Sequence, residues 1–199
     1  MLQRLTHLTL ASASPRRQQL LLQLQPALQL MIQPAEIDES LIEGEAASIR
    51  VLRLAQAKAE ASWQRLTPDQ QAWPLLAADT EVVLDGQALS KPANPEEATS
   101  FLTRLAGREH QVQTSVVLKT AQQTSHCLVT TQVKMRALDP AEIEAYIATQ
   151  EYQDKAGGYA IQGQAAAFIE QIQGSYTNVV GLPLEAVYQL LTHHGYTVI

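Results

Sequence analysis

The chain has 199 residues, of which 46% are hydrophobic and 17% charged, so it can bury one substantial core. Its formal net charge of −6 excludes a general electrostatic attraction to nucleic acid or to an anionic membrane. The one cysteine, Cys127, excludes an intrachain disulfide and a thiolate zinc cage, and it fits a reducing compartment.

Chain length and hydropathy also bear on domains and location. We expect residues 1–199 to form a single domain, because two independently folding halves would each bury a smaller share of their surface. No segment approaches the roughly 18 consecutive apolar residues that span a bilayer, and the N-terminal stretch does not resemble a signal peptide. The sequence therefore predicts a cytoplasmic protein that is not membrane-spanning and is not secreted by that route.

The first half of the chain alternates short apolar runs with helical patterns. Ser14 and Pro15 suit the N-cap and first position of a helix, and Asp85-Gly86 is a two-residue hairpin signal. The elements predicted in chain order are a strand at 8–10, a helix at 16–24, a strand at 31–32, an amphipathic helix at about 45–66, a buried strand at 73–84 and its hairpin partner at 88–89.

The second half continues this alternation. Asn94-Pro95 and Asp139-Pro140 each combine a capping side chain with a proline, so both predict helix starts. The other predicted elements are strands at 111–118, 125–135 and 168–172, a loop at 151–163 and a last helix at 183–191. Together the elements predict a mixed α/β sheet with helices on its faces.

Two arginines lie in the first turn of the first predicted helix. The helix dipole places positive partial charge there and disfavours each cation by about 0.3–1 kcal/mol. A bound phosphate would offset this cost, because backbone N–H groups, the Ser12 and Ser14 hydroxyls and both guanidinium groups would converge on its oxygens. The alternative is that Arg16 and Arg17 are solvated on a surface helix.

Asp79 and Glu81 interrupt the predicted buried strand. Buried carboxylates are costly unless they are paired or bind a metal, and period-two alternation puts both on one face. The alternative for Glu81 is an outward-facing polar edge. The hairpin carries Lys91 opposite Thr80, so Lys91 and Asp79 share a site only if the strand bulges, twists or ends there. Otherwise Lys91 belongs to an ordinary surface turn.

A third group combines Asp38 and Glu39 with Lys58 of the long predicted helix. Acidic groups near phosphates need a cation between them, and Mg²⁺ prefers a few carboxylates together with phosphate oxygens and water. Lys58 would neutralise phosphate charge, or it would extend from an apolar helix face into solvent. The five histidines lack zinc-ligand spacing, and no Walker-type loop is present.

Segments along nearly the whole chain resemble, in order, those of the Maf family. They are Leu10-Ala11-Ser12-Ala13-Ser14-Pro15-Arg16-Arg17, Ile37-Asp38-Glu39, Leu54-Ala55-Gln56-Ala57-Lys58-Ala59, Ala78-Asp79-Thr80, Lys91-Pro92, Asp154-Lys155-Ala156-Gly157-Gly158-Tyr159-Ala160-Ile161-Gln162-Gly163 and Gly174-Ser175-Tyr176-Thr177-Asn178-Val179-Val180-Gly181-Leu182-Pro183.

This resemblance implies an elongated α/β fold shared with the inosine triphosphate pyrophosphatases, with two lobes around a central cleft. It also implies a homodimer, which is frequent in the family. It implies cleavage of a nucleoside triphosphate between its α and β phosphates with a divalent metal, Mg²⁺ or Mn²⁺. Asp79 matches the proton acceptor, and Asp79 or Glu39 would bind the metal. The other positions that match the phosphate and metal pocket are Lys58, Lys91, Ser12 and Arg17.

Arg16, Thr80 and Gln162 match the branch of the family that acts on dTTP and UTP, whereas the 7-methyl-GTP branch tends to carry Trp, Gln and Glu there. We therefore expect hydrolysis of dTTP or UTP, with CTP and modified pyrimidine nucleotides as further candidates, and we expect Thr80 and Gln162 to help select the base. Gly158 and residues 164–167 depart from the family pattern. The alternatives are a non-catalytic, nucleotide-binding inhibitor of septum formation and a purine house-cleaning enzyme.

Overall fold

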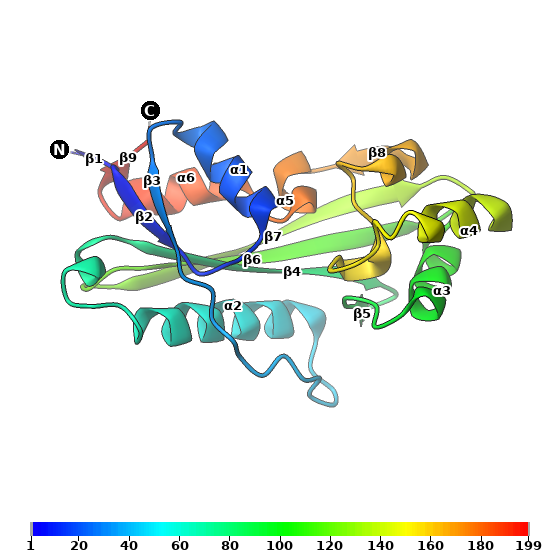
Figure 1. Ribbon diagram of the computed structural model, residues 1–199, viewed down its shortest axis with the longest axis horizontal. Coiled ribbons are helices and arrows are strands. Elements are labelled where there is room, and N and C mark those ends of the chain that lie inside the picture. The colour runs from blue at the N-terminus through cyan, green and yellow to red at the C-terminus, as the bar shows by residue number, and fades with distance from the viewer. Residues whose placement is uncertain (1, 199) are drawn as a thin grey trace.

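A seven-stranded sheet forms the centre of the fold in the computed structural model, which describes residues 2–198 (Figure 1). Residues 1 and 199, which the expected single domain includes, lie outside the described part. The strands are β1 (Gln3–Arg4), β2 (His7–Leu10), β3 (Gln29–Ile32), β4 (Leu75–Leu84), β5 (Gln87–Leu89), β6 (Glu109–Lys119), β7 (Thr124–Met135), β8 (Ile169–Gln173) and β9 (Tyr196–Thr197). The α-helices are α1 (Pro15–Leu24), α2 (Ala47–Trp63), α3 (Pro95–Leu105), α4 (Pro140–Ala148), α5 (Tyr176–Val180) and α6 (Leu184–His193), and 3₁₀ turns lie at Gln70–Ala72, Ala156–Gly158 and Gln164–Phe168.

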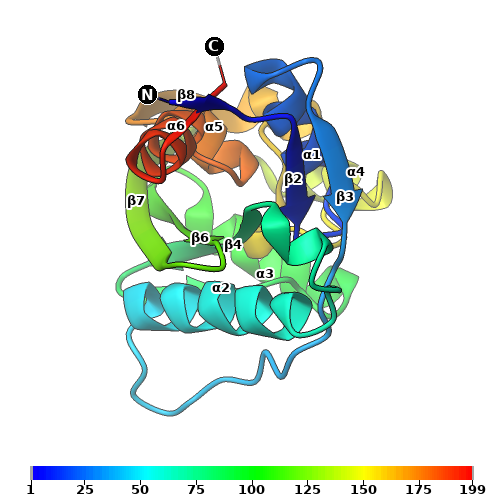
Figure 2. The ribbon, with the colours of Figure 1, turned by 90° about the vertical axis from the view of Figure 1, so that its left-hand side faces the viewer.

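The sheet is mixed, as the sequence predicts. Its strand order is β3-β2-β4-β6-β7-β8, and β5 pairs with β4. β2 runs parallel to β3 and β4, whereas the other ladders of this sheet are antiparallel. Helix α2 covers one face, and α1, α5 and α6 lie over the other face at one end of the long strands (Figures 1 and 2). None of the described helices has the length and apolar character needed to span a membrane.

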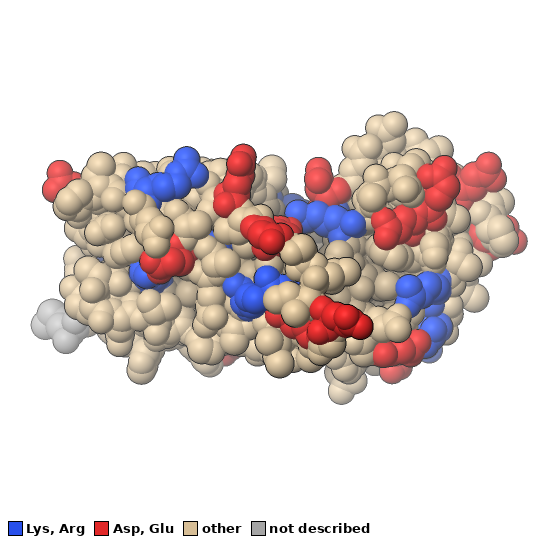
Figure 3. All heavy atoms as spheres, turned by 90° about the horizontal axis from the view of Figure 1, so that it is seen from below, with Lys and Arg blue, Asp and Glu red and all other residues tan. Residues whose placement is uncertain are grey.

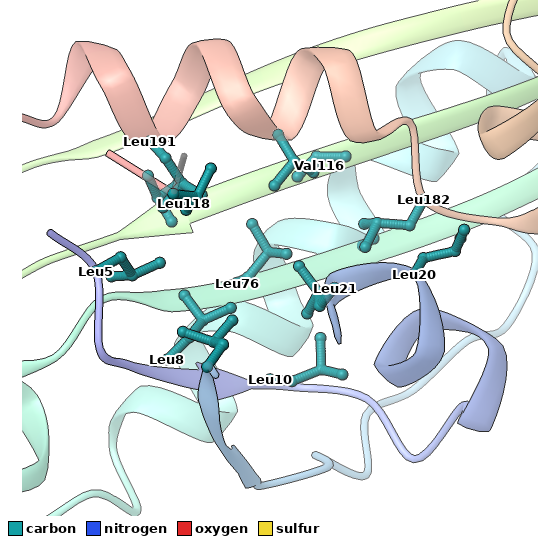
Figure 4. Close-up of a cluster of buried hydrophobic side chains, with 14 of the residues drawn as sticks. Leu5, Leu8, Leu10, Leu20, Leu21, Leu76, Val116, Leu118, Leu182 and Leu191 are labelled. Atoms are coloured by element: carbon teal, nitrogen blue, oxygen red, sulfur yellow. The ribbon is translucent and has the colours of Figure 1, made fainter. Parts of the chain in front are cut away.

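One face of β4 contributes apolar side chains to two separate hydrophobic clusters. Leu76 and Ala78 pack in a first cluster with residues of β2, α1 and α6, where the leucines of these elements point toward one another (Figure 4). Val82 and Leu84 pack in a second cluster with residues of α3 and α4. Thr80 lies between the two groups on the same face, since side chains alternate along a strand.

The neighbouring strand β6 repeats this pattern. Val116 belongs to the first cluster and Val112 to the second, and Thr114 lies between them. Thr80 and Thr114 are partners in the β4–β6 register, and their hydroxyl oxygens are 3.0 Å apart. Polar residues therefore mark the boundary between two apolar lobes, and this agrees with the predicted two-lobe form.

The opposite face of β4 packs against α2. Leu75 and Ala77 form a third cluster there with Val117 of β6 and with Ala55 and Ala59 of the helix. Alanine side chains are short, so they allow the helix backbone to lie close to the sheet. This close packing matters because it holds Arg50 and Lys58 of the same helix against the same face of β4.

Most predicted elements are confirmed, with boundaries that differ by a few residues. The hairpin forms in the predicted register, with Leu84 opposite Gln87 and Val83 opposite Ala88. Ser14 lies at the N-cap position of α1 and Pro15 at its first position, as predicted, although the Ser14 side chain makes no capping hydrogen bond. The sequence patterns missed the short helix α5 and the parallel pair β1–β9, which joins segments from opposite ends of the chain.

Candidate active site

A stretch of β4 is paired on only one of its edges. β6 pairs with β4 from Leu75 to Val83, whereas on the other edge β2 pairs only with Leu75 and Leu76 and β5 only with residues 82–84. Among the described residues, no strand pairs with this edge between positions 77 and 81. Side chains from both faces of β4 can therefore reach one space beside this edge.

A cavity of about 770 Å³ occupies this space between the lobes. The nine residues that the resemblance assigns to the site all line it: Ser12, Arg16, Arg17, Glu39, Lys58, Asp79, Thr80, Lys91 and Gln162. Asp38 and Glu81, which the sequence grouped with Glu39 and Asp79, are not among the residues that line it. The nine residues come from separate stretches of the chain, namely the start of α1, the connection from β3 to α2, α2 itself, β4, the segment after β5 and the loop after α4. The fold thus brings together the residues that were predicted to share a site.

Arg17 is anchored by three separate segments. Its Nε donates to the Gly181 carbonyl oxygen at 2.8 Å, and its two terminal nitrogens donate to Ser12 Oγ at 3.2 Å and Thr80 Oγ1 at 3.1 Å. Burial lowers the pKa of Arg17, and the nearby charge of Asp79 opposes that shift. The side chain is therefore a fixed cation of the cavity, not a solvated surface arginine.

Arg16, Lys91 and Gln162 line the cavity with more freedom. Lys91 and Gln162 are exposed and Arg16 is half-buried. Burial lowers the pKa of Arg16, and the charge of Asp154 opposes this shift. No hydrogen bond or ion pair from the described residues fixes these three side chains, so they can adjust to a ligand.

Lys58 joins the two acidic residues of the site. Its Nζ lies 2.6 Å from Asp79 Oδ1 and 2.7 Å from Glu39 Oε1. Asp79 is 7% exposed, whereas the Glu39 side chain is 41% exposed. Burial raises the pKa of Glu39, but the hydrogen bond and charge of Lys58, aided by Lys91 and Arg50, outweigh burial and lower that pKa. Lys58 therefore neutralises carboxylates in this state and does not extend freely into solvent.

The register conflict between Lys91 and Asp79 is resolved by the end of a strand. β5 stops at Leu89, so the ladder ends before Lys91 and alternation no longer fixes its direction. Ser90 still lies near Glu81, since its hydroxyl donates to Glu81 Oε2 at 3.3 Å. The strand's end is one of the three conditions under which the sequence allowed a shared site.

Glu81 faces α2 on the same side of β4 as Asp79, as period-two alternation predicts. It is 3% exposed and forms an ion pair with Arg50, which is buried as well. The alternative of an outward-facing edge is therefore wrong for Glu81. Its partner Arg50 carried no signal in the sequence, because an arginine near the start of an amphipathic helix is unremarkable by pattern alone.

The oxygen donors of the site suit a hard divalent cation. Carboxylate oxygens of Asp79 and Glu39 converge on one point, where Lys58 Nζ lies. Among residues 2–198 no group of three or more His, Cys, Asp or Glu side chains could hold a metal. Mg²⁺ commonly takes one or two carboxylates and completes its shell with phosphate oxygens and water, so these two residues fit a metal that arrives with a phosphate ligand.

Comparisons with known proteins find relatives over nearly the whole chain. The family model described as Maf-like protein matches residues 7–194. A relative from Yersinia pestis named dTTP/UTP pyrophosphatase is 47% identical over 189 residues, which cover 95% of this chain and 93% of the relative. Relatives with the same name from Nitrosomonas europaea (47% identity, 95% of each chain) and Escherichia coli (43% identity, 95% of this chain and 93% of the relative) are similar over the same extent.

A likeness among solved structures concerns the fold. A HAM1 protein from Coxiella burnetii superposes with a TM-score of 0.51 at 16% sequence identity, covering 95% of this chain and all of that chain. This similarity confirms the predicted mixed α/β fold of the Maf and inosine triphosphate pyrophosphatase type. At this level of identity it shows the fold alone.

Proposed function

This chain belongs to the Maf family, and on that premise we propose that it is a cytoplasmic nucleoside triphosphate pyrophosphatase that converts dTTP and UTP to the monophosphate and pyrophosphate. Relatives 43–47% identical over most of the chain are named dTTP/UTP pyrophosphatase. The observation that carries the proposal is the meeting of cations and two carboxylates in one cavity between the lobes.

The cations of the cavity bind the triphosphate in this proposal. The molecule carries a net charge of −6, and Figure 3 shows acidic and basic side chains next to each other on the face seen from below. Attraction for a highly charged anion must therefore come from local groups. Arg16, Arg17, Lys58 and Lys91 provide them, and they stabilise the charge that develops on the pyrophosphate leaving group.

Asp79 is the proposed general base. Its Oδ1 accepts a hydrogen bond from Lys58, and no side chain of residues 2–198 donates to Oδ2, so that oxygen can accept a proton from the attacking water. The water oxygen bonds to the α phosphorus, the bond to the α–β bridging oxygen breaks, and pyrophosphate leaves with that electron pair. Asp79 and Glu39 would hold Mg²⁺ or Mn²⁺, which would supply further charge neutralisation on the phosphates.

The two residues proposed to select the base differ in their freedom. The Gln162 amide is exposed at the rim, and an amide offers both a donor and an acceptor to a pyrimidine edge. The Thr80 hydroxyl already contacts Arg17, Thr114 and the Gly181 carbonyl oxygen. We therefore assign base contacts to Gln162, and Thr80 would act mainly by fixing Arg17.

A substrate panel tests the proposed function. dTTP, UTP, CTP, 7-methyl-GTP and ITP are incubated with the protein, with and without a chelator, and monophosphate and pyrophosphate are quantified. We expect turnover of dTTP and UTP that the chelator abolishes. Asp79→Asn should lose turnover while remaining folded by circular dichroism. Tight binding of dTTP without product would instead indicate a nucleotide sensor.

A further inference from the structure

Glu39 lies on a connection without regular structure. Residues 33–46 join β3 to α2 with neither helix nor strand, and in Figure 1 this segment crosses in front of α2 before it turns back to the start of that helix. A carboxylate on such a segment is held in place only by contacts to more rigid elements. Lys58 provides one of these contacts, because it binds the Glu39 carboxylate.

Arg50 provides a second contact to the same residue. Its terminal nitrogen Nη2 donates to the Glu39 main-chain carbonyl oxygen at 2.8 Å. The guanidinium group also forms an ion pair with Glu81, and the two side chains are only 6% and 4% exposed. Glu39 is thus held at its carboxylate by Lys58 and at its main chain by Arg50.

The two cations form parallel cross-links between α2 and β4. Arg50 and Lys58 are eight residues apart on the helix, so they project about 80° apart around its axis, within the broad face that α2 turns toward β4. Their partners Glu81 and Asp79 are two residues apart on one face of the strand. Arg50 therefore ties the segment carrying Glu39 to the strand that carries Asp79.

Stability alone does not explain why Arg50 and Glu81 form a buried ion pair. Replacing such a pair by apolar side chains of similar volume is often neutral or stabilising, because the charges lose their hydration on burial. An apolar pair at these positions would fill the space, but it would have no donor for the Glu39 carbonyl oxygen. We propose that Arg50, held by Glu81, is a positioning residue that fixes Glu39 relative to Asp79 and Lys58. This inference rests on the function proposed above.

The test removes both charges at once, so that neither is left buried and unpaired. In Arg50→Met/Glu81→Met, we expect an unfolding temperature near that of the wild type, and amide hydrogen exchange in residues 36–46 that is roughly tenfold faster without any ligand. We expect kcat for dTTP to fall roughly 10- to 100-fold, as for other supporting residues, with a smaller change in KM.

A matched control removes another pair that links α2 to the sheet. Lys119 of β6 binds Glu60 of α2, away from residues 36–46, so Lys119→Met/Glu60→Met should leave both exchange and kcat unchanged. Arg50→Lys is a second variant, which keeps the charge but lacks the forked donor. It should fold stably and show faster exchange and lower kcat than the wild type.

The outcomes separate this inference from the proposed function. Wild-type exchange and kcat in a folded double variant would overturn the positioning role while leaving the activity intact. If the double variant does not fold, the same two measurements on Arg50→Lys decide. If wild-type protein turns over none of the nucleotides, the proposed function fails, and exchange in residues 36–46 alone decides whether Arg50 holds the segment.

Discussion

Removing the Lys58 ammonium should destabilise the protein measurably. In Lys58→Met the aliphatic stem remains, but Asp79 and Glu39 lose the cation that lies 2.6 Å and 2.7 Å from their oxygens. Breaking a fully buried pair costs about 3–5 kcal/mol. Because the Glu39 side chain is 41% exposed and water can reach the cavity, we expect a smaller loss of about 2–3 kcal/mol. For a chain of this length that corresponds to an unfolding temperature lower by about 5–10 °C.

The stability that Lys58 contributes should also change with pH in a defined direction. Lys58 helps to hold the pKa of Glu39 below its ordinary value of 4.5, so the stability from this carboxylate is present above pH 4.5 and is lost as pH falls through the lowered pKa. The difference between wild type and Lys58→Met should therefore be largest near pH 7 and should narrow below pH 4.5.

Thermal and urea unfolding by circular dichroism at pH 7 and pH 4 measure this difference. Lys134→Met is a matched control, because Lys134 Nζ lies 3.1 Å from Glu170 but both side chains are at least 40% exposed. Its loss should cost less than about 0.5 kcal/mol. Wild-type stability of Lys58→Met at pH 7, or a difference that widens toward pH 4, would show that Lys58 does not stabilise these carboxylates.

Two further predictions concern the second core. His110 is 2% exposed, and burial lowers its pKa from 6.5 to about 4. The neutral imidazole therefore contributes stability above pH 6.5, and the free energy of unfolding should fall by about 3 kcal/mol as the pH drops to 4. In His110→Gln the free energy of unfolding should depend less steeply on pH over that range, and an unchanged slope would contradict this. Gly157 has φ +68° and an added Cβ would lie 2.9 Å from Val82 Cγ2, so Gly157→Ala should cost about 2–4 kcal/mol in urea unfolding. Gly86→Ala, with φ +77° and open space, should cost only about 1–2 kcal/mol, and equal losses in the two variants would argue against the clash.

Local chemistry made much of the fold predictable. Asn94 accepts a hydrogen bond from the Glu97 backbone at 2.8 Å, and Asp139 forms a full capping box with Glu142, so both helix starts followed from short-range signals. The Asp85-Gly86 turn fixed the hairpin register for the same reason. Such contacts lie within a few residues, and their geometry does not depend on the rest of the chain.

Long-range arrangements could not be predicted in this way. The site depends on the edge of β4 that β2 and β5 leave unpaired, and this follows from the strand order, which no local pattern encodes. The ion pair between Arg50 and Glu81 spans 31 positions and was likewise invisible. The resemblance to Maf segments identified the residues of the pocket, while the structure shows which of them are fixed and which are free.

In the proposed reaction, water bound in this cavity attacks the α phosphorus of a pyrimidine nucleoside triphosphate. Hydrolysis of dTTP in ¹⁸O-labelled water, followed by mass spectrometry of both products, tests it most directly. We expect one labelled oxygen in thymidine monophosphate and none in pyrophosphate. Label in the pyrophosphate, or release of thymidine diphosphate and inorganic phosphate, would contradict it.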